Sequence, residues 1–319
     1  MPSPRPLPRT LALLELGVLV LVAIGCLVFQ LRLPGQLPSE DHYRAVADAL
    51  RAEARPGDAV LLFPWWTERA RLYLPPALPL YGYLGSDQDD LGAHPRVWVL
   101  AQPGLPRARE ADFLAAFQPG RTMEGSPRQV GPLELTLYAN GRYQPRRFVA
   151  SEVPASARVY LESPEGARQD CPFDGRVHRC PGPPHLYVAA EWHEIRYEPR
   201  HCLWMHAPGG PQRLVAEFQG VPADTEWRLE AGIVSEFASH QGPRLSTTHV
   251  GVEDARGRES LMTLSLPPGR EGVQRVARAL PPGPSRTVRL WVQANNAESR
   301  QVCLDLLALG PGAATAEGR

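Results

Sequence analysis

Apolar positions form one long run near the start of the chain and short alternating runs in the rest of it. Residues 11–31 are almost entirely apolar, and Glu15 is the single charge among them. About 20 apolar residues suffice to cross a hydrocarbon core roughly 30 Å thick, because a helix rises about 1.5 Å per residue. The pattern therefore predicts a transmembrane helix over residues 11–31, preceded by a cytoplasmic N-terminus, residues 1–10.

Two alternatives fit the same N-terminal pattern. The sequence "AIGC" over residues 23–26 resembles a bacterial lipoprotein cleavage site, with Cys26 as the acylated residue. A simple cleaved signal peptide is the other alternative. Arg5 and Arg9 favour a cytoplasmic N-terminus, although Arg32 on the far side weakens the charge difference. In all three cases the rest of the chain lies outside the cytoplasm, and we expect the uncleaved anchor.

Residues 40–143 alternate between helix-spaced and strand-like apolar patterns. Ser39 is suited to cap a helix over residues 40–54, because its hydroxyl can accept hydrogen bonds from the first free backbone N–H groups. The apolar runs "AVLLF" and "RVWVLAQ" predict buried strands over residues 59–63 and 96–102. The remaining elements are predicted as helices over residues 64–74 and 108–117, a short strand over 78–84 and an edge-like strand over 133–140. This order predicts a small α/β sheet domain over residues 40–143.

Beyond this domain, short alternating runs are separated by Gly and Pro clusters, as is typical of all-β domains. In "VRLWVQ" the aliphatic positions alternate with Trp291, which places Trp291 on the opposite face of the strand. Strands are predicted around residues 157–163, 185–191, 193–198, 213–221, 227–234, 246–254, 261–266, 287–294 and 301–309. The pattern predicts a β-sandwich of the jelly-roll type over residues 146–310 and a disordered tail over residues 311–319.

The expected fold class is therefore α+β multidomain, with a single N-terminal transmembrane helix, a small α/β sheet domain and a C-terminal β-sandwich. Composition narrows the function classes further. The formal net charge is zero and 43% of the residues are hydrophobic, which argues against a nucleic-acid partner. All 34 basic residues are arginine, so a phosphate-loop lysine and a Schiff-base lysine are both excluded. We expect no cofactor.

Four cysteines follow the apolar segment, namely Cys171, Cys180, Cys202 and Cys303. An even number of cysteines in an oxidising compartment points to disulfides, and these four can pair in three ways. We expect Cys171 with Cys180 and Cys202 with Cys303, because the first pair closes its own short turn. In the chain-entropy model a loop of about 10 residues contributes about 2.7 kcal/mol and one of about 100 residues about 4.7 kcal/mol.

A Cys/His metal site is the alternative use of these cysteines. Histidines gather near them, at His178, His185, His193, His201 and His206. Their spacing matches neither a zinc finger nor an H-E-x-x-H motif. We therefore expect no metal.

Signatures of catalysis are missing from the sequence. It contains no G-x-S-x-G elbow, no phosphate loop and no G-x-G-x-x-G. Asp87, Asp89 and Asp90 in "SDQDD" could bind a divalent cation or act on a sugar, because clustered carboxylates raise one another's pKa. A solvated loop that caps the following turn explains them equally well. We expect no catalytic residues and a protein that is not an enzyme.

Sugar-binding sites combine an aromatic face with polar groups that bond hydroxyls. The candidate ligand-binding residues are Trp291 with Asn295, Asn296 and Arg300, and separately Trp192 with His193. The aromatic pair Trp65 and Trp66 could also stack on a sugar or a lipid headgroup. Packing in a core is the alternative role for every one of these aromatic side chains.

The motifs "YRAVADALRAEARPGDAVLLFPWW", "RLYL", "GYLGSDQDDL" and "RVWVLAQP" lie within residues 43–139. This region resembles the soluble domain that follows the membrane region in bacterial dolichyl-phosphate-mannose-type glycosyltransferases. Those enzymes keep their catalytic carboxylates in loops between many transmembrane helices, which this chain lacks. The resemblance implies a detached relative or partner of a polytopic membrane glycosyltransferase. We expect the chain in the bacterial inner membrane, with its body periplasmic or extracytoplasmic.

The motifs "CLWMHAPGGPQRLVAEFQGVP", "LEAGIVSE", "THVGVED" and "VRLWVQANNAESRQVCLDLL" lie within residues 186–308. They resemble galactose-binding-like jelly-roll domains of bacterial envelope proteins. We therefore expect a membrane-anchored, non-catalytic envelope protein whose β-sandwich binds carbohydrate or another envelope component. The alternatives are a scaffold or regulatory subunit of a polytopic glycosyltransferase and an extracytoplasmic glycan hydrolase.

Overall fold

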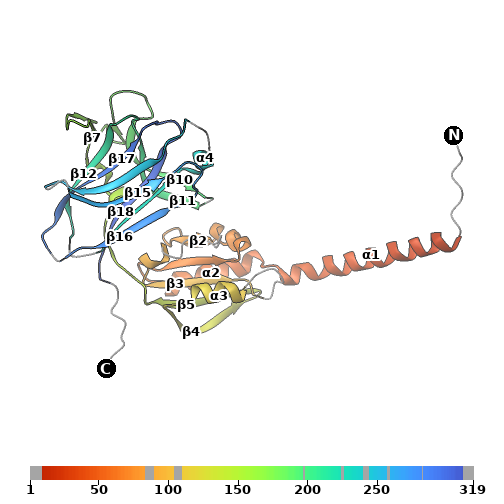
Figure 1. Ribbon diagram of the computed structural model, residues 1–319. Coiled ribbons are helices and arrows are strands. Elements are labelled where there is room, and N and C mark those ends of the chain that lie inside the picture. The colour runs from red at the N-terminus through yellow and green to blue at the C-terminus, as the bar shows by residue number, and fades with distance from the viewer. Residues whose placement is uncertain are drawn as a thin grey trace, which may run out of the picture. The chain divides into compact units, whose positions relative to one another are not determined.

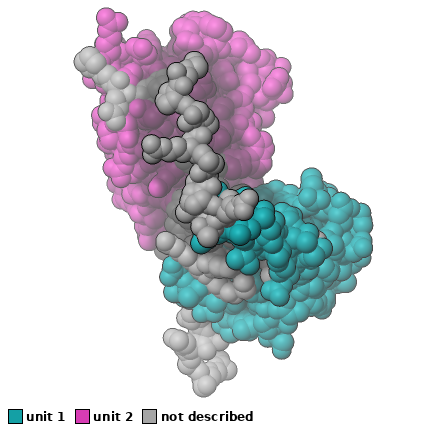
Figure 2. Space-filling view, turned by 90° about the vertical axis from the view of Figure 1, so that its right-hand side faces the viewer, with its two compact units in different colours: residues 1–142 teal, residues 143–319 magenta. Residues whose placement is uncertain are grey.

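The computed structural model describes residues 9–82, 90–103, 110–196, 198–223, 226–239, 244–256, 259–281 and 283–311. The chain divides into two compact units, residues 1–142 and residues 143–319, which Figure 2 colours separately. Asp87 and Asp89 lie outside the described residues, as do residues 1–8 and 312–319.

The N-terminal apolar segment forms one continuous helix, α1 (Arg9–Gln36), seen in Figure 1. Residues 13–33 of α1 are long and apolar enough to cross a membrane, and none of this window is buried inside the structure. A core helix of a soluble domain would be buried, so α1 is not one. A membrane anchor and a signal sequence both fit this helix.

Helix α2 (Glu40–Glu53) begins at the predicted cap. The Ser39 hydroxyl accepts a hydrogen bond from the His42 backbone N–H at 3.4 Å, and the His42 ring accepts one from the Ser39 N–H at 3.0 Å. This reciprocal pair satisfies two backbone donors at the helix start. The buried stripe of α2 is Tyr43, Val46, Ala47 and Leu50, which packs on the sheet.

The sheet of the first unit has the order β2-β1-β3-β5-β4. Its strands are β1 (Ala59–Phe63), β2 (Leu80–Gly82), β3 (Arg96–Ala101), β4 (Arg121–Val130) and β5 (Leu133–Asn140). Strand β1 is parallel to β2 and β3, and β5 is antiparallel to β3 and β4. Helix α2 packs on one face, and α3 (Glu110–Phe117) packs on the other, so the unit has three layers.

Three details of this unit differ from the sequence pattern. Strand β5 is internal rather than edge-like, because β4 pairs along its outer side. The sequence pattern does not predict strand β4, because nearly all of its side chains are exposed and most of them are polar. The segment predicted as a helix over residues 64–74 is the 3₁₀ helix η1 (Trp65–Leu72), and the short 3₁₀ helix η2 (Asp90–Ala93) precedes β3.

The second unit is a β-sandwich. Within the described residues one sheet has the order β16-β13-β18-β11-β10-β9, with β6 paired to β18, and the other has the order β15-β14-β17-β12-β7-β8. We call these sheet B and sheet C. Their strands are β6 (Arg146–Val149), β7 (Arg158–Glu162), β8 (Arg168–Asp170), β9 (His178–Arg179), β10 (Tyr187–Ile195), β11 (Glu198–His206), β12 (Arg213–Val221), β13 (Glu226–Ile233), β14 (Thr248–Asp254), β15 (Glu259–Leu266), β16 (Gln274–Ala279), β17 (Arg286–Ala294) and β18 (Gln301–Leu309). Short helices are η3 (Ala150–Glu152), η4 (Pro154–Ser156) and α4 (Ser235–Ala238).

The core of the sandwich lies between the two sheets. Alternate side chains of each strand face inward, for example Leu203 and Leu304 of sheet B and Leu214, Phe218 and Leu290 of sheet C. All five are almost completely buried. The intervening residues lie on the outer faces of the sheets, where a ligand could reach them.

Sheet B differs from the sequence pattern at several strands. The pattern predicts β11 only at its first residue, Glu198, and does not predict β6 or β9. Separate strands are predicted over residues 185–191 and 193–198, but β10 continues unbroken as far as Ile195. The chain reverses at Arg196, whose φ of 50° lies in the left-handed region used by turns. The sequence pattern does not predict strand β16, because its arginine-rich sequence has no buried apolar stripe.

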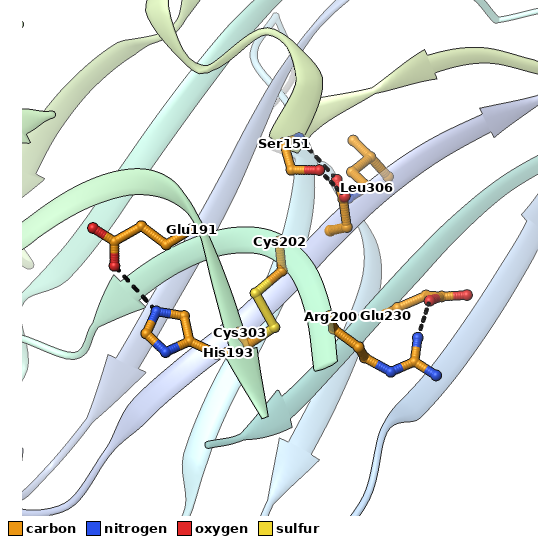
Figure 3. The surroundings of a disulfide bond; sticks show 9 residues. Ser151, Glu191, His193, Arg200, Cys202, Glu230, Cys303 and Leu306 are labelled. Atoms are coloured by element: carbon orange, nitrogen blue, oxygen red, sulfur yellow. Dashed lines mark hydrogen bonds and ion pairs between the residues drawn. A yellow bond between two sulfur atoms is a disulfide. The ribbon is translucent and has the colours of Figure 1, made fainter. Parts of the chain in front are cut away.

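The cysteines pair as predicted. The Cys171–Cys180 disulfide spans a sequence separation of 9, and the Cys202–Cys303 disulfide spans 101. The second disulfide joins the neighbouring strands β11 and β18 on the outer face of sheet B. Figure 3 shows it among three polar pairs. Ser151 donates to Asp305 of β18, Arg200 points to Glu230 and His193 points to Glu191.

Candidate functional site

Trp291, the aromatic side chain predicted to stack on a sugar, lies on the outer face of sheet C but is only 6% exposed. It packs against Tyr160 and Val215, and the Arg213 guanidinium lies 4.2 Å from its ring centroid. Gly251 on the neighbouring strand allows this close packing, because a Cβ at that position would overlap the ring. The predicted free aromatic face is therefore buried, since residues from adjacent strands cover it.

The same face carries a charged network around Arg289, which is 2% exposed. Its guanidinium donates to Glu162, to Glu253 at 3.2 Å and to the Tyr160 hydroxyl at 2.9 Å. The Tyr160 hydroxyl in turn donates to Glu217 at 3.1 Å. Burial raises the pKa of Tyr160 to about 12. Burial opposes ionisation of Glu162, but the hydrogen bond and charge of Arg289 outweigh it and lower the pKa of Glu162.

Asn295 and Asn296 shape the loop after β17. The Asn295 carbonyl accepts a hydrogen bond from the Gly210 backbone N–H at 2.8 Å. The Asn296 side chain donates to the Arg244 carbonyl at 2.7 Å and accepts from the Glu298 N–H at 3.0 Å. Four residues of extended chain, roughly 13 Å, separate Asn295 from Trp291. These two asparagines therefore hold the loop in place and form no common site with Trp291.

Arg300, the fourth predicted member of that site, is completely buried. Its Nε donates to the Glu298 carbonyl at 3.3 Å. Nη1 and Nη2 have no hydrogen-bond partner among the residues that the structure describes. Burial lowers the pKa of Arg300. The predicted contact between Arg300 and a ligand does not fit this position, because the side chain is completely buried.

The second predicted pair, Trp192 and His193, points to opposite faces of β10. Trp192 is 69% exposed and lies beside the His201 ring, with 5.4 Å between the ring centroids. His193 stacks on Trp204 with 4.5 Å between centroids, and its Nε2 is 3.1 Å from a Glu191 carboxylate oxygen. One side chain is free and the other is packed, so the two do not form one site.

A pocket of about 370 Å³ opens where β11 ends and β18 begins. Its lining residues are His185, His206, Ala297, Glu298, Ser299 and Gln301. His206 and Gln301 lie directly opposite each other in the β11–β18 ladder. The other residues come from the loop after β17 and from the segment before β10. Strand pairing thus brings together residues about 100 positions apart.

His206 is the most buried polar group of this pocket, with 4% exposure. Its Nδ1 lies 2.8 Å from the Ala207 carbonyl oxygen, and its ring centroid is 4.5 Å from that of His185. Burial lowers the pKa of His206, and His185 lowers it further, although the bond to Ala207 opposes both. Gln301 contributes a buried side-chain oxygen that has no hydrogen-bond partner in the described part of the chain.

The described residues contain no group of three His, Cys, Asp or Glu side chains able to hold a metal ion. Histidines 185 and 206 and Glu298 share the pocket but do not form such a group. The side chains of Trp65, Trp66 and Asp90 lie outside what the structure describes.

Sequence reasoning did not identify the pocket residues as one site. The sequence pattern offers His185 and His206 only as candidate metal ligands, and it groups the loop residues Asn295, Asn296 and Arg300 with Trp291. The available signal was the position of this loop between two strong strand patterns, because loops at strand ends often carry binding groups.

No protein-family model matches this chain, and no curated protein matches it. Part of this chain is similar to solved carbohydrate-binding modules. A family 51 module from Clostridium perfringens in complex with methyl-galactose is 12% identical, with a TM-score of 0.26, covering 47% of this chain and 80% of that chain. The xylan-binding module of family 15 is 8% identical, with a TM-score of 0.28, covering 49% and 93%. The C-terminal family 6 module of a laminarinase from Zobellia galactanivorans is 12% identical, with a TM-score of 0.24, covering 39% and 92%.

Proposed function

We propose that this chain is a membrane-anchored extracytoplasmic protein whose β-sandwich binds carbohydrate, without catalysis, in the pocket at the β11–β18 end of sheet B. The observation that carries the proposal is the pocket itself. It is concave, it combines apolar wall with a few polar groups, and two of those groups, on His206 and Gln301, retain hydrogen-bonding capacity. Ligand sites in proteins have this composition, and sugars offer many hydroxyls to such groups.

The proposed location outside the cytoplasm is supported by two independent features. Helix α1 has the length and composition of a membrane span. The Cys171–Cys180 and Cys202–Cys303 disulfides belong to an oxidising compartment. We assign the anchor to the bacterial inner membrane and the sandwich to the periplasmic side.

A second role, contact with a polytopic membrane glycosyltransferase, is proposed for α1. Its apolar side chains from Leu13 to Leu31 are exposed, so they can pack against other membrane helices. Purification of the intact chain in mild detergent tests this role. Recovery of a polytopic transferase with the wild type, and its loss when α1 is replaced by an unrelated apolar helix, is the expected result. A chain that purifies alone contradicts it.

A glycan-array screen of the full chain in mild detergent tests the carbohydrate proposal. Galactosides and xylan-type oligosaccharides should be included as probes. We expect one sugar class to bind, and Gln301→Leu to weaken that binding at least tenfold. Gln274→Leu on β16, a glutamine outside the pocket lining and two strands away from β18 in the sheet, is the matched control and should bind as the wild type does. If folded protein binds no glycan on the array, the proposal is contradicted.

A further inference from the structure

We infer that the pocket selects uncharged sugars over acidic ones, because it presents hydrogen-bond acceptors on His206 and Gln301, and Glu298 is the only acidic residue, with no arginine, among its described lining residues. This inference rests on the proposed function and names the ligand class of the same site. It concerns the groups on His206, Gln301 and Glu298.

His206 presents an acceptor. The Ala207 carbonyl can only accept a hydrogen bond, so the 2.8 Å contact requires the hydrogen to sit on Nδ1 of His206. In a neutral imidazole the other nitrogen, Nε2, then carries a lone pair and accepts. No described residue bonds to this Nε2. Because burial and the adjacent His185 both lower the pKa of His206, the ring stays neutral at and above neutral pH.

Gln301 presents a second acceptor beside the first. Its buried side-chain oxygen lacks a partner among the described residues, and an unpaired buried oxygen costs free energy that a ligand donor would recover. His206 and Gln301 are directly opposed on neighbouring strands. Directly opposed residues hold their Cβ atoms about 5 Å apart, so one small ligand can reach both side chains.

The charge of the lining disfavours an acidic ligand. Glu298 is exposed at the pocket wall, and the described residues of the lining include no arginine. The nearest basic residue along the chain, Arg300, is fully buried and is not part of the lining. A sugar carboxylate would therefore lie beside the Glu298 carboxylate and the two acceptors, and among the described lining residues only neutral donors, such as the Gln301 amide and the Ser299 hydroxyl, could offset this. A hydroxyl at the same place would donate to the acceptors.

The size of the pocket limits how much ligand it can enclose. At about 370 Å³ it lies near the lower end of the roughly 300–1,000 Å³ common for small-molecule sites. A volume of this size suits one or two sugar rings. The expected ligand is therefore the end of a neutral glycan, and we place its hydroxyls against His206 Nε2 and Gln301.

Matched pairs of sugars test the inference directly. Methyl glucoside and methyl galactoside are compared with the corresponding glucuronate and galacturonate, which differ only in carrying a carboxylate at C6. Affinities for the full chain in detergent are measured by calorimetry at pH 8, well above the lowered pKa of His206. We expect a neutral hexose to bind at least tenfold more tightly than its uronate. A uronate that binds as well as or better than its hexose overturns the inference but leaves carbohydrate binding standing, whereas no binding of any sugar by folded protein overturns the proposed function as well.

Glu298→Gln identifies the source of the selectivity. Removing the carboxylate should raise uronate affinity relative to hexose affinity, so that the ratio falls at least threefold. Glu236→Gln, at an exposed position on α4, is the matched control and should keep the wild-type ratio. An unchanged ratio in Glu298→Gln would show that the carboxylate does not discriminate and would overturn this part of the inference.

Discussion

The outer faces of the two sheets carry similar residue types but differ in how their polar groups are used. On sheet C, Arg289 donates to two carboxylates and a tyrosine hydroxyl, and Trp291 is covered by Arg213. At the pocket end of sheet B, His206 Nε2 and the Gln301 oxygen have no partner among the described residues. Aromatic and charged residues are therefore a poor guide to a binding face, whereas hydrogen-bonding groups left open beside a cavity are a better one.

Breaking the sheet C network should have the largest effect. Arg289→Met removes the buried cation that lies between Glu162 and Glu253, so that Glu162 keeps only Arg168 at 3.2 Å and Glu253 keeps only Arg213 at 2.7 Å. Breaking a buried ion pair by removing one partner costs about 3–5 kcal/mol, and we expect a loss of this size in the free energy of unfolding. Chemical denaturation measures it, with Arg256→Met, at an exposed position after β14, as the control. A loss below about 1 kcal/mol would mean that the network does not stabilise this face.

Truncating Trp291 should have the next largest effect. Removing a large buried aromatic side chain costs about 3 kcal/mol or more, so Trp291→Ala should unfold at clearly lower denaturant concentration. Because the ring lies on sheet C, the variant should keep its sugar affinity within about twofold under conditions where it remains folded. A stable Trp291→Ala variant that no longer binds sugar would show that Trp291 belongs to the binding site.

The buried carboxyl group of Asp305 on sheet B should make the free energy of unfolding depend on pH. Burial, together with the charge of Glu230, raises the pKa of Asp305 to about 7, against the opposing hydrogen bonds from Ser151. The folded state therefore holds a proton that the unfolded state releases near pH 4, so stability is greatest at low pH and is lost as the pH rises towards and through 7. Denaturation at pH 5 and pH 8 should differ by about 2 kcal/mol. Asp305→Asn should largely remove this difference, and an equal difference in the variant would assign it to other groups.

Local features of the fold follow from the sequence, since the deciding residues are close together. The Ser39 cap, the buried strands around Leu61 and Leu290 and the short Cys171–Cys180 disulfide all depend on neighbours along the chain. Strand β4 could not be found in this way, because its exposed polar side chains leave no apolar alternation.

The site depends on contacts that the sequence does not display. Alternation correctly places Trp291 on an outer face, but its burial depends on Gly251 and Arg213, which belong to other strands. The pocket requires His206 and Gln301 to be opposed in one ladder. That register is a long-range property, so the two side chains look unrelated in the sequence.

The most direct test of the central claim follows both faces in one experiment. Isotope-labelled full-length protein in detergent micelles is titrated with the tightest-binding neutral sugar, while NMR records the imidazole signals of His206 and His249 and the indole N–H of Trp291. Binding in the pocket predicts that the His206 Nε2 signal moves in proportion to the bound fraction, and that His249 and Trp291 on sheet C do not move. If the Trp291 signal moved while the His206 signal stayed unchanged, the account would be contradicted and the sugar would lie on sheet C.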